Sequence, residues 1–110
     1  MWIIKESTLK TFYRAHPDAQ GPLVAWIKEI EAARYENPAQ LKAKHGSADF
    51  VGKVVVFDIG GNRYRLIAQF RYANNRTTPP RHGIAYVLFV GTHHEYDALD
   101  VAALKIELSR

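Results

Sequence analysis

The chain has 110 residues, a mass of 12.5 kDa and a formal net charge of +4 at pH 7. Hydrophobic residues make up 47% of it, which excludes an intrinsically disordered chain, and the absence of cysteine excludes disulfide scaffolds, thiolate catalysis and cysteine-based zinc sites. No apolar run approaches the ~20 residues of a membrane span, and the N-terminus lacks a signal-peptide pattern. We therefore expect one soluble, cytoplasmic domain over residues 1–110, with no membrane partner.

The first half of the chain predicts helices. Residues 3–4 are a short apolar strand candidate, and Ser7 is expected to cap the helix that follows. One face of that helix is apolar at helical spacing: Leu9, Phe12, Tyr13 and His16. Pro17 ends it, and Pro22 fits the first turn of a second helix. The buried stripe of the second helix is Leu23, Trp26, Ile27, Ile30 and Ala33. Asn37 and Pro38 predict the cap and first turn of a third, short helix.

The second half of the chain predicts strands. Residues 50–59 form a β run, residues 60–62 (Gly-Gly-Asn) a tight turn, and residues 63–72 the returning arm of a hairpin. A long polar loop follows over residues 73–81.

The segment of residues 84–90 is nearly all apolar, as in a central strand, and residues 97–108 favour a C-terminal helix. The order indicates an α+β fold with helices on one face of a small, mainly antiparallel sheet. We expect the other face to be open and available for a site.

Positive charge is concentrated in one part of the sequence. Between Ile59 and His94 there is no Asp or Glu, and every basic residue other than histidine is an arginine: Arg63, Arg65, Arg71, Arg76 and Arg81. Arginine forks match phosphate oxygens, so the block favours a polyanion partner, most simply a nucleic acid. Ordinary solvated surface charge is the alternative interpretation.

Strand alternation divides the returning arm of the hairpin into two faces. One face has the character of a core: Tyr64, Leu66, Ala68, Phe70 and Tyr72. The other carries three arginines and a glutamine: Arg63, Arg65, Ile67, Gln69 and Arg71. If that face is open it forms a phosphate-binding platform; alternatively its arginines pair with acids elsewhere.

A second candidate site follows the apolar strand, in residues 91–97. His93 and His94 can exchange protons near neutral pH, and Tyr96 offers a hydroxyl or a stacking face. Glu95 and Asp97 could orient a histidine or act as bases, although Thr92 or Asp97 could instead simply cap a helix. A metal site from His93, His94 and Asp97 is disfavoured because adjacent strand residues point apart. We expect no metal and no cofactor.

Several blocks of sequence, taken in order, resemble one known family. Residues 47–50 (Ser-Ala-Asp-Phe), 55–66 (Val-Val-Phe-Asp-Ile-Gly-Gly-Asn-Arg-Tyr-Arg-Leu) and 89–97 (Phe-Val-Gly-Thr-His-His-Glu-Tyr-Asp) are similar to the HigB-type toxins of type II toxin–antitoxin systems. His16 to Ala19 and Trp26 fit as well, so the resemblance covers roughly residues 1 to 100. It implies a RelE-like fold.

The resemblance implies ribosome-dependent cleavage of mRNA and neutralisation by a helix-turn-helix (HigA-type) antitoxin, through which the toxin meets operator DNA. It implies catalytic roles for Arg65, His93 and Tyr96. The loop of residues 73–81 is longer than the family turn, and His94 falls at a variable position.

We expect the RNA 2′-hydroxyl to attack the adjacent phosphate without a metal ion, with His93 transferring a proton and Tyr96 positioning the base or sharing that transfer. Arg65 is expected to bind the phosphate. The RNA-binding set predicted around it is Lys42, Lys53, Arg63, Arg71 and His94. A non-catalytic RNA- or ribosome-binding module and a metal-dependent hydrolase are the alternatives.

Overall fold

A computed structural model describes residues 1–104 of the chain. Its strands are β1 (Trp2–Ile4), β2 (Asp49–Val51), β3 (Val54–Ile59), β4 (Tyr64–Arg71) and β5 (Ile84–Thr92). Its α-helices are α1 (Glu6–Ala15), α2 (Gln20–Ala32), α3 (Pro38–Lys44) and α4 (His93–Asp97), and short 3₁₀ turns span Pro17–Ala19 and Val101–Ala103. The sheet has the strand order β1-β5-β4-β3-β2; β1 runs parallel to β5, and the other pairs are antiparallel.

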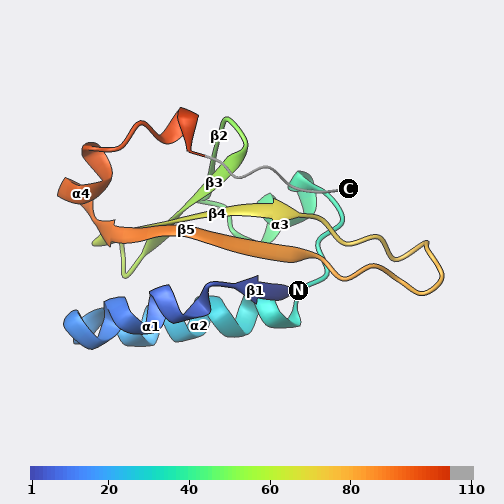
Figure 1. The fold of residues 1–110 in the computed structure, drawn as a ribbon, viewed down its shortest axis with the longest axis horizontal. Coiled ribbons are helices and arrows are strands. Elements are labelled where there is room, and N and C mark those ends of the chain that lie inside the picture. Colours follow the sequence, from blue (N-terminus) through green and yellow to red (C-terminus); the bar gives the residue numbers. More distant parts are fainter. Residues whose placement is uncertain (105–110) are drawn as a thin grey trace.

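Helices α1 and α2 cover one face of this sheet (Figure 1). Their predicted apolar stripes enter a large core together with the core face of β4, and Leu9, Leu23, Ile30, Leu41 and Leu66 are all fully buried there. The predicted α+β class is therefore confirmed, with helices packed on one face of a mainly antiparallel sheet.

The starts of the helices agree with the sequence in one case and differ in another. Asn37 caps α3 as predicted, because its side-chain oxygen accepts a hydrogen bond from the backbone N–H of Gln40 at 2.9 Å. Ser7 does not cap α1. That helix begins at Glu6, two residues earlier than a Ser7 cap would place it, and follows Lys5 in a left-handed conformation (φ 66°) with no capping side chain.

Two tight turns shape the hairpins. The predicted turn at residues 60–62 is confirmed, with φ of 66° at Gly60, 62° at Gly61 and 80° at Asn62. The single strand predicted over residues 50–59 is wrong, because β2 and β3 are separate strands there. The chain instead turns at Gly52 (φ 57°), where an added Cβ would lie 3.0 Å from the carbonyl oxygen of Ala102.

The second face of the sheet is not open, contrary to expectation. A smaller cluster centred on Val54, Val56 and Ile67 is packed against the segment that follows β5, which contributes Tyr96, Leu99, Val101 and Leu104. Figure 1 shows this segment, in orange and red, on the side opposite α1 and α2. The predicted helix over residues 97–108 is also wrong: α4 starts at His93, and residues 105–108 lie outside the described part.

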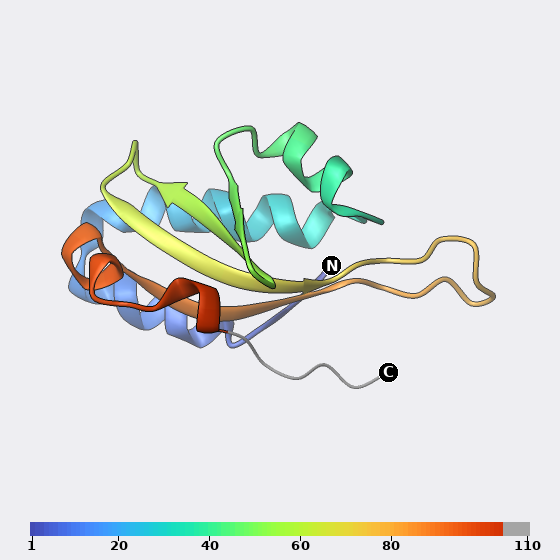
Figure 2. The same ribbon diagram turned by 90° about the horizontal axis from the view of Figure 1, so that it is seen from above.

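The strand predicted over residues 84–90 corresponds to β5, an internal strand that pairs with β1 on one side and β4 on the other. The long polar loop before it is an arm that extends beyond the sheet (Figure 2). Among residues 1–104, no helix is both long and apolar enough to cross a membrane.

Candidate active site

The predicted catalytic residues converge where β4 begins, β5 ends and α4 starts. In the antiparallel register, Tyr64 pairs with Thr92 and Arg65 with Gly91. His93 follows directly as the first residue of α4, at the end of the sheet opposite the arm (Figure 1). A rigid strand pair therefore fixes the position of the candidate site.

Arg65 lies at the centre of this site. Its guanidinium Nη1 donates hydrogen bonds to the carboxylate of Asp58 and to the side-chain oxygen of Asn62. Its Cζ is 5.5 Å from the centroid of the Tyr96 ring, which is a cation–π contact. The Arg65 side chain is only 19% exposed. Three different elements thus hold one guanidinium in a defined place at the surface.

Asn62 connects Arg65 to His93. While its side chain accepts from Arg65, its backbone carbonyl oxygen contacts Nε2 of His93. A carbonyl oxygen can only accept, so this contact places a hydrogen on Nε2. In the neutral ring the lone pair is then on Nδ1, for which the described residues offer no hydrogen-bond partner. The turn therefore orients both the cation and the imidazole.

The short helix α4 presents His93 and Tyr96 together. Residues three apart in a helix lie on neighbouring positions of its surface. Thr92 caps α4 in a reciprocal capping box: its hydroxyl accepts from the Glu95 N–H at 3.2 Å, and Glu95 Oε1 accepts from the Thr92 N–H at 2.8 Å. This backbone hydrogen bond lowers the pKa of the Glu95 carboxyl and so favours its carboxylate at the N-terminus of α4.

Arg63 does not share a face with Arg65, so the predicted three-arginine platform is wrong. Its Nη1 lies 2.8 Å from Asp18 Oδ2 in the 3₁₀ turn of the helical layer, and the Tyr64 hydroxyl donates to the same carboxylate at 2.7 Å. The hydrogen bonds from Tyr64 and then Arg63 lower the pKa of Asp18. Farther along the supposed platform, Ile67 is fully buried and Gln69 is 4% exposed.

The other predicted RNA-binding residues lie away from this cluster or beside it. Arg71 is six positions from Arg65 along β4, about 20 Å at ordinary strand spacing. Lys53 is in the β2–β3 turn, at the end of β3 opposite Asp58. Lys42 donates to the Ala48 carbonyl oxygen at 2.6 Å. His94 is an exposed neighbour of His93 on α4.

Sequence reasoning gave no role to Asp58 or Asn62. A signal for Asp58 was present, because a turn over residues 60–63 pairs Ile59 with Tyr64 and hence Asp58 with Arg65. A signal for Asn62 was also present, because it follows two glycines in a tight turn. A residue with left-handed backbone angles at such a position points its carbonyl oxygen away from the hydrogen bonds between the two strands.

The described residues include no group of three histidine, aspartate or glutamate side chains placed to hold a metal ion, and His93, His94 and Asp97 form no such group. The cluster combines a fixed guanidinium, an imidazole with a free Nδ1 and a phenol. Such groups can bind a phosphodiester and move protons at it. The fold and the cluster together define a small α+β protein with a surface site suited to phosphodiester chemistry.

Comparison with known protein families gives this class a name. The family model of the HigB toxins, the RelE-like toxic components of toxin–antitoxin systems, matches residues 19–99. The chain belongs to this family, and the resemblance inferred from its sequence blocks is confirmed. As a toxic component, it has an antitoxin as its partner.

Curated relatives match over nearly the whole chain. The mRNA interferase toxin HigB of Escherichia coli strain K12 is 30% identical over 100 residues, which cover 88% of each chain. The mRNA interferase HigB of Shigella flexneri matches with the same values. The mRNA interferase HigB of Escherichia coli O6:H1 strain CFT073 is 26% identical over 102 residues, covering 90% of this chain and 91% of the relative.

Proposed function

We propose that this toxin is an mRNA endoribonuclease and that Arg65, His93 and Tyr96 form its catalytic site. The names of the curated relatives support the substrate. The observation that carries the site assignment is the convergence on Asn62, whose side chain and carbonyl contact Arg65 and His93. A single turn residue thereby fixes a cation and an imidazole relative to each other, as proton transfer at a phosphodiester requires.

In the proposed reaction, the RNA 2′-hydroxyl attacks the adjacent phosphorus and the bond to the 5′-oxygen breaks. Nδ1 of His93 takes the 2′-hydroxyl proton, because Nε2 is already engaged with the Asn62 carbonyl. Arg65 stabilises the negative charge of the phosphorane, with the Tyr96 ring against its guanidinium. A proton from the Tyr96 hydroxyl or from solvent completes the step. The products are a 2′,3′-cyclic phosphate and a 5′-hydroxyl, and the reaction is expected to proceed in EDTA.

Asp58 has a separate part in this proposal. In the free protein its carboxylate is bound to Arg65, in the place that a substrate phosphate oxygen would take. When RNA binds, its phosphate must therefore displace the Asp58 carboxylate from the Arg65 guanidinium. This exchange favours RNA presented in a fixed geometry, as on a translating ribosome, over free RNA.

The proposal includes the cellular setting. The toxin cuts messages on the ribosome in the cytoplasm, and a helix-turn-helix antitoxin neutralises it and carries it to operator DNA. Family membership supports the antitoxin, and the position of the half-buried site at the end of β4 and the start of α4 supports access to a codon.

The test is a map of new 5′-hydroxyl ends in cellular mRNA shortly after induction, beside a His93→Ala/Tyr96→Ala variant. We expect cuts in phase with codons that are absent from the variant. Inhibited translation without new ends would instead support a non-catalytic ribosome-binding protein. Equal cutting by the variant would refute the assigned site.

A further inference from the structure

Residues 72–83, which link β4 to β5, form an ordered arm that projects from the sheet at the end opposite Arg65 (Figures 1 and 2). Asn74 and Arg81 pair across it through two backbone hydrogen bonds, of 3.0 and 2.8 Å. Near the tip, the single hydrogen of the Thr77 hydroxyl is shared between the carbonyl oxygens of Asn74 and Pro79, at 3.1 and 2.9 Å. The arm therefore has a defined shape of its own.

The charge on this arm is not neutralised within the described part of the chain. Arg76 and Arg81 are exposed, and neither forms an ion pair with any residue of 1–104. Glu36 is the acid at the base of the arm, and its Oε2 accepts from the backbone N–H of Asn75 at 3.2 Å. Arg76 and Arg81 also line a cleft of about 510 Å³ beside this base, together with Asn74, Gln40 and Glu36 itself, so the cleft holds two cations and one anion. The cleft therefore keeps an excess of positive charge, and its two arginines, neither of them in an ion pair with a described residue, fit successive anionic groups.

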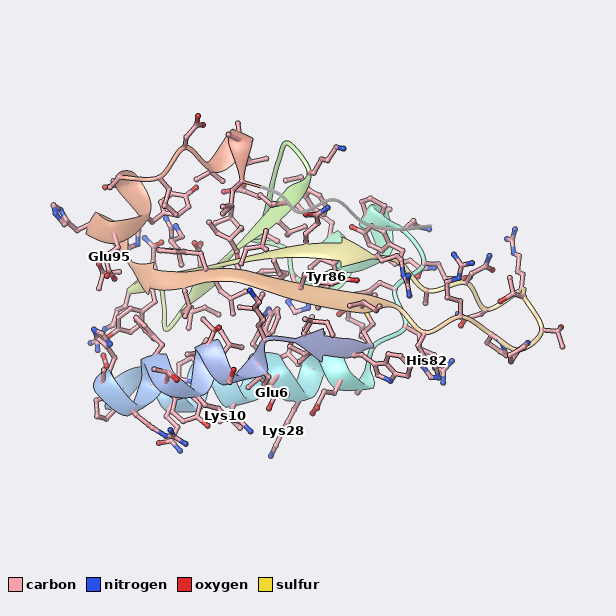
Figure 3. All side chains as sticks on the ribbon, in the orientation of Figure 1. Glu6, Lys10, Lys28, His82, Tyr86 and Glu95 are labelled. Atoms are coloured by element: carbon pink, nitrogen blue, oxygen red, sulfur yellow. The ribbon has the colours of Figure 1, made fainter. Side chains whose placement is uncertain are left out.

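An exposed aromatic pair lies at the root of the same arm. The Trp2 ring stacks on His82 with centroids 5.4 Å apart and an interplanar angle of 15°, and Trp2 is 61% exposed. Figure 3 shows His82 at this end of the molecule and Glu95, in α4, at the other. Exposed aromatic rings beside arginines are the usual surface for unpaired bases of single-stranded RNA. A duplex, with its bases stacked inside, would not use the Trp2 ring.

We propose that the arm and the Trp2–His82 pair form a second binding site for single-stranded RNA, distinct from the cleavage site. The proposal rests on RNA being the substrate of this toxin. Arg65 and Arg71 are already about 20 Å apart along β4, and the arm lies beyond Arg71. The arm therefore cannot share the scissile phosphate, and it holds RNA several nucleotides away from the cut.

The test measures binding of a short, fully 2′-O-methylated RNA, which cannot undergo 2′-hydroxyl attack. The Arg76→Gln/Arg81→Gln variant should bind about tenfold more weakly at low salt, and its plot of log affinity against log salt should flatten by about 1.4, the value for two lost phosphate contacts. The matched control is Arg14→Gln/Lys28→Gln, which removes the same charge from two exposed residues of α1 and α2 that form no ion pair with any described residue; Figure 3 labels Lys28. Its affinity should change less than about twofold.

Tryptophan fluorescence gives an independent readout. RNA should quench the emission of Trp2, and Trp2→Phe should remove that quenching, because Trp26 is only 4% exposed. Equal weakening by both double variants would mean attraction by net charge and would overturn the proposal. Displacement of the RNA by poly-glutamate at equal charge concentration would also overturn it, in favour of an acidic protein partner.

Failure of this proposal is distinguishable from failure of the proposed function. Codon-phased cuts in cells, with unchanged RNA binding by the arm variant, would reject the second site alone. Arm-dependent RNA binding without any cuts would reject the endoribonuclease and keep the second site.

Discussion

The two ends of β4 use arginine in opposite ways. At the α4 end, Arg65 and Arg63 are held by Asp58 and Asp18, which come from outside the acid-free stretch of sequence. At the arm end, Arg76 and Arg81 form no ion pair with any described residue. The same composition therefore produces a fixed cation at one end and free cations at the other. Fixed charge suits transition-state stabilisation, and free charge suits binding.

The largest expected effect is a difference in RNA cleavage between variants at the two ends of β4. Arg65→Ala should lower RNA cleavage by about 100-fold or more, because it removes the cation at the reacting phosphate. Arg81→Ala should lower it less than about tenfold, because it removes only a binding contact. The activity of both variants is measured from cell growth after induction and from the number of new 5′-hydroxyl ends in mRNA. Similar losses in the two, with equal melting temperatures, would contradict the division of roles.

A second variant sharpens the contrast at Asp58. Asp58→Asn keeps a side-chain oxygen for Arg65 but removes the anion that competes with phosphate. RNA binding should tighten by up to about fivefold, the equivalent of ~1 kcal/mol for a surface ion pair. Fluorescence anisotropy with the 2′-O-methylated RNA measures it. Weaker binding would show that Asp58 assists the phosphate site instead of competing with it.

A third comparison uses one threonine from each end. Thr92→Ala removes the capping hydroxyl of α4 and should lower the free energy of unfolding by about 1 kcal/mol. It should also lower cleavage, because α4 carries His93 and Tyr96. Thr77→Ala, at the tip of the arm, should change stability by less than about 0.5 kcal/mol and leave cleavage unchanged. Urea unfolding and end mapping compare the two, and identical losses would argue against a special role for α4.

The smallest effect is a pH dependence at the α4 end. Hydrogen bonding to Thr92 lowers the pKa of Glu95 from its ordinary value of 4.5, so below that value the unfolded chain binds more protons than the folded one. The contribution of Glu95 to stability is present above pH 4.5 and decreases as the pH falls below it. Melting temperatures of wild type and Glu95→Gln should therefore differ at neutral pH and approach each other as the pH falls below 4.5. A difference independent of pH would contradict this cause.

Much of the fold could be predicted because local patterns and tertiary packing agree there. The stripe of α2, the Asn37 cap, the turn at residues 60–62 and the core face of β4 all follow from spacing or backbone preference. β2 could not be separated from β3, because one left-handed glycine between apolar residues gives a weak turn signal.

The covered second face depends on contacts between distant segments. The sequence favours a helix over residues 97–108, but Leu99, Val101 and Leu104 instead pack against the cluster that contains Val54 and Ile67. At the site, Arg65, His93 and Tyr96 were chosen through the family resemblance, and the structure brings them together. The direction of Arg63 could not be predicted, because it depends on where the 3₁₀ turn places Asp18.

The central claim is that the Arg65–Asn62–His93 assembly cleaves RNA by attack of the 2′-hydroxyl. The most direct test is a purified translation reaction. The cleavage position in a message is mapped first, and a second copy of that message is then made with a single 2′-deoxynucleotide at that position. The account predicts that the unmodified message yields a cyclic phosphate and a 5′-hydroxyl, and that the substituted message stays whole at that position. Cleavage at the deoxynucleotide would contradict it.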